Sequence, residues 1–299
     1  MPIKAPFRME GDRFVTVASR QMGARAYLKH EVGFPASTLA AIPDGDILVN
    51  SAPLSPRTRL SEGDEISVLI VEEPREAPRS LPYEILWEDE HILAVSKPHG
   101  VPTHPSQGHR QDSLATAVSA YLGGRGARPV NRLDRDTSGI VLFAKHRLAA
   151  ALLFEEWKTG RVKKDYLALS SSLPVPACGT VELPIGRKDG SIITREIRAD
   201  GEYALTEYRT LPSGLLLVTP KTGRTHQIRV HMAAIGTPLL GDTLYAHPSP
   251  HISRQALHAA RLAFRHPMTG EAVILQAPLP EDIKAARRAL YPTKILEES

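Results

Sequence analysis

The chain has 299 residues, of which 37 are Lys or Arg, 33 are Asp or Glu and 42% are hydrophobic, so it carries enough apolar sequence to bury a sizeable core. This composition excludes a chain that is disordered throughout. The single cysteine, Cys178, cannot form an internal disulfide or supply a cysteine zinc cluster, which favours a reducing compartment.

The apolar stretches of the chain are short. Those at 140–144 and 215–218 fall far below the about 18–20 residues that a membrane-spanning helix needs. The first residues, MPIKAPFRMEGDRF, carry charges where a signal peptide requires an apolar run. We therefore expect no membrane span and a cytoplasmic location.

The N-terminal region predicts a small α+β unit. Residues 26–42, AYLKHEVGFPASTLAAI, predict two short helices interrupted at 33–35, and residues 44–73 show the period-two alternation of strands. The runs ILVN at 47–50 and LSEGDEISV at 60–68 resemble the ribosomal-protein S-four-type RNA-binding domain. Such modules carry Lys and Arg between their helices, whereas this chain has PAST at 35–38. Weak RNA binding and a purely structural role are both open.

A proline-rich segment, EEPREAPRSLP at 72–82, predicts a linker. We therefore expect an N-terminal domain over residues 1–72, a linker over 73–82 and a second domain over 83–299. Residues 1–75 hold nine Lys and Arg against ten Asp and Glu, so the net positive charge lies after the linker. This small surplus is only a weak indication of a polyanionic partner.

The second domain alternates strands and helices. Two short strands and a proline-rich loop are predicted over 84–105, a helix over 113–121, a polar loop over 131–139, a buried strand over 140–145 and a helix over 146–160 that ends at Gly160. A strand follows over 161–171, then a hairpin over 206–220 and a helix that starts near Thr225.

The loop NRLDRDTSG contains the first candidate for chemistry, Asp134. A carboxylate held there by Arg132 or Arg135 stays ionised, which suits a nucleophile or a general base. The local pattern alone favours the alternative, a solvated charged turn.

A second cluster surrounds Gly223. Helical spacing turns Arg229 inward, where it needs a carboxylate partner. Arg224 and His226 suit either phosphate binding or a solvated surface. His226 and His231 are five residues apart and so do not share a helical face, which argues against a metal site.

Tyr166, in a predicted strand, suits the core or a stacking platform for a base. Taken together, NRLDRDTSGIVLFAK, KKDYLAL and TGRTHQIRVHMAAIGTPLLGDTLY resemble the RluA-type pseudouridine synthases over about 82–277. The N-terminal region and linker resemble the two-domain members that modify ribosomal RNA. The resemblance implies an α+β, mixed α/β fold with a central, largely antiparallel mixed sheet, isomerisation of uridine to pseudouridine in RNA, no cofactor or metal, and a monomer.

The resemblance also assigns residues. It makes Asp134, Tyr166 and Arg229 catalytic: Asp134 as nucleophile or base, and Arg229 as its ion-pair partner. Tyr166 would pack against the flipped base, and help in the proton removal that ends the reaction is a second role open to it. Arg132 would fill the space that the uridine vacates, and Lys164, Arg224 and His226 would support RNA or the active site. Asn131 stands where many relatives have His, and Asp242 is expected to be structural.

Other functions stay open at this point. Ribosomal RNA is favoured over transfer RNA by the domain arrangement. The main alternative is a non-catalytic RNA-binding or RNA-folding protein on the same scaffold. A phosphate-handling enzyme is disfavoured because no Walker-type glycine loop accompanies Arg224 and His226.

Overall fold

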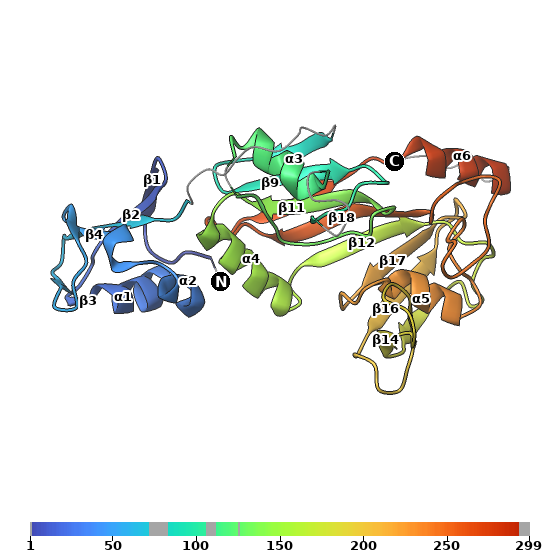
Figure 1. Ribbon diagram of the computed structural model, residues 1–299, viewed down its shortest axis with the longest axis horizontal. Coiled ribbons are helices and arrows are strands. Elements are labelled where there is room, and N and C mark those ends of the chain that lie inside the picture. Colours follow the sequence, from blue (N-terminus) through green and yellow to red (C-terminus); the bar gives the residue numbers. More distant parts are fainter. Residues whose placement is uncertain (1, 72–82, 106–111, 125, 293–299) are drawn as a thin grey trace.

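The computed structural model describes residues 2–71, 83–105, 112–124 and 126–292. The linker predicted over 73–82 lies outside these described residues. Figure 1 shows a small group of N-terminal elements beside a large sheet that is flanked by helices. No helix within the described ranges is long and apolar enough to cross a membrane.

The N-terminal elements form a five-stranded antiparallel sheet in the order β1-β2-β7-β4-β5. Its strands are β1 Phe7–Glu10, β2 Arg13–Val17, β4 Ile47–Val49, β5 Ala52–Pro53 and β7 Glu65–Leu69, and a second pair is formed by β3 Met22–Gly23 and β6 Arg59–Leu60. The helical segments are α1 Ala24–Tyr27, a π-turn η1 Leu28–Val32, α2 Ala36–Ala40 and a 3-10 turn η2 Asp44–Asp46. The predicted break at 33–35 is confirmed, because Gly33 ends η1 with a φ of 98°.

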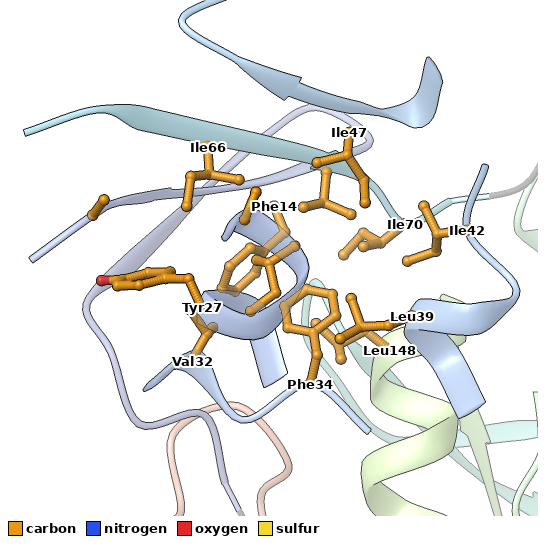
Figure 2. Packing of buried hydrophobic residues seen from close by; sticks show 14 of the residues in the cluster. Phe14, Tyr27, Val32, Phe34, Leu39, Ile42, Ile47, Ile66, Ile70 and Leu148 are labelled. Carbon is orange, nitrogen blue, oxygen red and sulfur yellow. The ribbon is translucent and has the colours of Figure 1, made fainter. Parts of the chain in front are cut away.

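The N-terminal core extends into the rest of the chain. Phe14 and Phe34 meet edge to face at 5.1 Å between ring centroids, and both are buried. Leu148 and Leu152 of α4, the helix Arg147–Lys158, belong to the same cluster. Figure 2 shows Leu148 among the N-terminal side chains. Burial of each such leucine contributes about 1.5–3 kcal/mol. The first half of α4 is therefore covered by the N-terminal elements.

The large sheet has ten strands, eight of them in the order β13-β16-β17-β12-β18-β11-β9-β8, with β10 paired to β11 and β19 to β18. All neighbours are antiparallel except β11 and β18, which run parallel. The expected largely antiparallel mixed sheet is confirmed. The strands are β8 Glu84–Glu88, β9 Ile92–Lys97, β10 Arg128–Pro129, β11 Ser138–Ala144, β12 Lys163–Ala168, β13 Cys178–Glu182, β16 Leu205–Thr210, β17 Leu216–Pro220, β18 Leu257–Arg265 and β19 Ala272–Gln276.

The longer helices lie around this sheet (Figure 1): α3 Leu114–Tyr121, α4 Arg147–Lys158, α5 Gln227–Ala234 and α6 Glu281–Leu290, while β14 Ile185–Arg187 and β15 Arg195–Ile197 form a separate hairpin. His146 caps α4 by accepting the N–H of Ala149 at 3.1 Å, and Gly160 follows its end with a φ of 69°. The helix predicted to start near Thr225 begins two residues later, at Gln227, because His226 before it takes a left-handed conformation.

Gly139 fixes the place where β11 meets β18. Its φ is 115°, and a Cβ atom there would lie 2.3 Å from the carbonyl oxygen of Ala259 on β18. Only glycine fits such a close approach at a positive φ. The loop that carries Asp134 is thereby anchored five residues before a tightly constrained point of the sheet.

Candidate active site

A cavity of about 740 Å³ opens between the loop before β11, the end of α4, β12 and the loop that enters α5. This volume falls in the range of ligand-binding pockets. All seven candidate residues from the sequence line it: Arg132, Asp134, Lys164, Tyr166, Arg224, His226 and Arg229. The fold thus brings together three segments that lie far apart in the sequence.

The loop that carries Asp134 is held by side chains that bond its backbone. Asn131 bridges the loop to the backbone of β11, donating at 3.0 Å and accepting at 2.8 Å. The Thr103 hydroxyl donates to the Leu133 carbonyl at 2.9 Å and faces the Leu133 N–H at 3.1 Å. The departure at Asn131 is therefore accommodated as a structural contact with the sheet.

Lys97, which the sequence reasoning missed, lies beneath the same loop. Its ammonium donates to three backbone carbonyls, those of Pro98, Val101 and Arg135, at 2.9, 2.6 and 2.8 Å. The side chain is 1% exposed, and burial lowers the pKa of Lys97 to about 7 against the opposing charges of Asp136 and Asp134. A lysine at the end of a buried strand, in SKPHG, was the available signal.

Arg229 points inward from α5, as predicted, and bonds two carboxylates. Its Nε and Nη2 donate to Asp242 at 2.7 and 2.8 Å, and its Nη1 donates to Asp134 at 3.3 Å. Burial opposes the charged guanidinium, but the bonds to Asp242 and the charges of both carboxylates raise the pKa of Arg229. The ion pair expected between Arg229 and Asp134 is present, and its bond is longer than the two bonds that Arg229 makes to Asp242. Asp242, fully buried, is the main partner.

Tyr166 faces the cavity from β12. Burial and the nearby charge of Asp134 both raise the pKa of its phenol, so Tyr166 keeps its proton at neutral pH. A protonated tyrosine of this kind can stack on a base or donate a hydrogen bond. Because the raised pKa keeps the phenol protonated, Tyr166 suits these roles better than the role of a proton acceptor.

His226 is held close to Asp134. Its φ of 58° is left-handed, its Nδ1 lies 2.8 Å from the Tyr245 hydroxyl, and its Nε2 lies 3.9 Å from the Asp134 carboxylate. Burial lowers the pKa of His226 despite the nearby charge of Asp134, so the ring is neutral at pH 7. Such backbone strain at a buried polar residue is typical of functional sites.

Arg224, Lys164 and Arg132 differ in how strongly they are bonded to other groups of the protein. Arg224 bonds Glu202 and the Tyr203 carbonyl, so its guanidinium is committed to the protein. Lys164 donates to the Thr222 carbonyl at 3.2 Å, and burial lowers the pKa of Lys164. Arg132 is exposed at the mouth of the cavity and has no ion pair with any residue that the structure describes.

No group of three or more His, Cys, Asp or Glu side chains within the described ranges is arranged to hold a metal ion. What the cavity offers is one partly exposed carboxylate, 22% exposed, fixed by a buried arginine and flanked by a neutral histidine and a protonated tyrosine. Such a carboxylate can attack a carbon atom or remove a proton.

Comparisons with known proteins agree with this geometry. A family model described as RNA pseudouridylate synthase matches residues 91–234. An uncharacterized RNA pseudouridine synthase of Bacillus subtilis is 41% identical over 80% of this chain and 88% of its own length. Ribosomal large subunit pseudouridine synthase D of Xanthomonas campestris is 36% identical over 83% of this chain and 82% of its own. The structure of human RNA Pseudouridylate Synthase Domain Containing 1 superposes with a TM-score of 0.55 and 28% identity, covering 69% of this chain and 86% of that one. The chain therefore belongs to the RluA-type RNA pseudouridine synthases, isomerases that act on RNA.

Proposed function

We propose that this enzyme isomerises uridines of ribosomal RNA to pseudouridine. Relatives named ribosomal large subunit pseudouridine synthase D, at 33–36% identity in three bacteria, support this choice of RNA. We further propose that it acts as a cytoplasmic monomer, with residues 1–72 as a small domain that resembles a degenerate S-four-type RNA-binding module, 73–82 as a linker and 83–299 as the catalytic domain.

The observation that carries the catalytic proposal is the position of Asp134, which lies in the cavity within 3.3 Å of Arg229 and near enough to Tyr166 to raise the pKa of its phenol. In the reaction the bond between C1′ and N1 breaks, the uracil turns and a bond from C1′ to C5 forms. The proton on C5 then leaves for solvent, and N1 takes up a proton from solvent, so the product is an isomer of uridine. Asp134 acts at the base ring, at C1′ or on a sugar proton. Arg229 bonds the Asp134 carboxylate and holds it in position.

The RNA must deliver its uridine unstacked. Extrusion of a base costs a few kcal/mol. Arg132, exposed at the mouth, is placed to enter the vacated space and stack there. Tyr166 stacks on the uracil, while Lys164 and His226 line the cavity beside it. Arg224 supports the α5 loop rather than a phosphate, because its guanidinium is already bonded to Glu202.

Tritium release tests this proposal. Unmodified ribosomal and transfer RNA transcripts labelled at C5 of uracil are incubated with the enzyme, and released tritium is counted. We expect release from ribosomal RNA. Release from transfer RNA alone would contradict the proposed substrate, and retention of all tritium in native RNA from a strain lacking the enzyme would contradict the proposed activity.

A further inference from the structure

An aromatic and basic face of α4 lines the cavity and has no part in the roles assigned above. Phe154, Trp157 and Lys158 follow a spacing of three and four residues, which places them on one side of the helix. Phe154 is 49% exposed, whereas the other five phenylalanines of the chain are buried or half-buried. An exposed aromatic ring in a cavity of this size is available to stack on part of a bound ligand.

The position of this face follows from the packing of α4. Leu148 and Leu152 pack into the N-terminal core, and Leu153 packs beneath the large sheet, so the helix is held from two sides. Trp157 also packs against the cluster beneath the sheet, which fixes it at the cavity wall. Phe154 belongs to neither cluster. It is presented to the cavity by a rigid helix.

The charge around this face suits RNA. Lys158 and Arg132 are exposed at the cavity, and neither has an ion pair with another residue in the described part of the chain. Two acids lie on this part of α4, and neither lines the cavity: Glu156 is buried and bonded to Arg161, and Glu155 is exposed. Unpaired cations bind backbone phosphates, and a flat aromatic ring beside them stacks on a base of any sequence.

We propose that Phe154 and Lys158 form a second nucleotide subsite, in which the base next to the target uridine stacks on Phe154 and its phosphate is bound by Lys158. The inference deepens and rests on the proposed function. The cavity, at about 740 Å³, is larger than one pyrimidine nucleotide requires, and its wall at α4 belongs to a different element from Asp134 and Tyr166. The occupant is thus an unstacked nucleotide of the same RNA strand.

Kinetics on unmodified ribosomal RNA give the first test. A stacked neighbouring base is bound alike in the ground and transition states, so Phe154→Leu should raise KM about 5- to 150-fold and leave kcat unchanged. Phe154→Tyr should keep the wild-type KM because it keeps the ring. Tyr121→Leu removes a ring that is 52% exposed on α3, outside the cavity, and should leave both constants unchanged. An unchanged KM in Phe154→Leu overturns the subsite and leaves the proposed function intact.

A binding assay decides the subsite even if no RNA is turned over. A short oligouridylate carrying one 2-aminopurine beside a central uridine should lose fluorescence on wild-type enzyme and on Phe154→Tyr, and keep it on Phe154→Leu. Lys158→Gln should weaken binding and lower the slope of log K against log salt by about 1. Fluorescence that is unaffected by the wild type, with the label on either side of the uridine, would overturn the proposal.

Discussion

The two carboxylates that bond Arg229 should respond very differently to neutralisation. Asp242 is fully buried and makes the two short bonds at 2.7 and 2.8 Å, whereas Asp134 is 22% exposed and makes one bond at 3.3 Å. Asp242→Ala leaves a buried guanidinium without its main partner, which costs about 3–5 kcal/mol. Asp134→Ala removes a single partly exposed contact, worth about 0–1 kcal/mol.

Because a domain is stable by only about 5–15 kcal/mol, the two variants are readily separated. Urea unfolding, followed by the fluorescence of the two tryptophans, gives the free energy of unfolding for each. Asp242→Asn keeps one acceptor oxygen and should fall between wild type and Asp242→Ala. Equal destabilisation by Asp134→Ala and Asp242→Ala would refute the view that Asp242 holds the arginine and Asp134 is free for chemistry.

Two further predictions concern the framework of the site. Gly139→Ala should lower the free energy of unfolding by more than about 2 kcal/mol in thermal melts, because its Cβ would meet the Ala259 carbonyl oxygen at 2.3 Å. Gly160→Ala should lower it by only about 1 kcal/mol, because Gly160 has a φ of 69° but open space around it. Equal costs would refute the close approach. Burial lowers the pKa of His146 to about 3, below the value of about 6.5 in the unfolded chain, so the unfolded state binds the extra proton first. His146 therefore contributes a fall of about 1.4 kcal/mol per pH unit in the free energy of unfolding between about pH 6.5 and about pH 3. His146→Asn keeps a capping oxygen and should lessen that slope in urea titrations at pH 7 to 5, and an unchanged slope would contradict the assignment.

The local patterns of the sequence predicted many of the elements between residues 26 and 234, but no strand or helix before or after that range. The break at Gly33, the strand within β11 and the end of α4 shortly before Gly160 follow from glycine conformation and apolar periodicity, which act within a few residues. The parallel pairing of β11 with β18 does not follow from such patterns, because more than a hundred residues separate Ser138 from its partner His258.

For the site as well, some residues could be predicted from the sequence and others could not. The motif resemblance proposed Asp134, Tyr166 and Arg229, and the structure places all three at one cavity. The supporting contacts were not predictable. Asp242 was expected to be structural, but its bonds to Arg229, shorter than the one from Asp134, could not be read from the sequence. Lys97 was missed, because its bonds reach a loop 38 residues away and their use depends on how the strands pack.

The most direct measurement of the central claim compares wild type with Asp134→Asn. Unmodified ribosomal RNA is mixed with excess enzyme, its nucleosides are analysed for pseudouridine, and binding of the same RNA is measured in parallel. Asparagine keeps the shape of the side chain and removes the charge that the reaction needs. We predict pseudouridine with the wild type, none with Asp134→Asn, and closely similar RNA binding by both. Pseudouridine formed at the wild-type rate by Asp134→Asn would contradict the account.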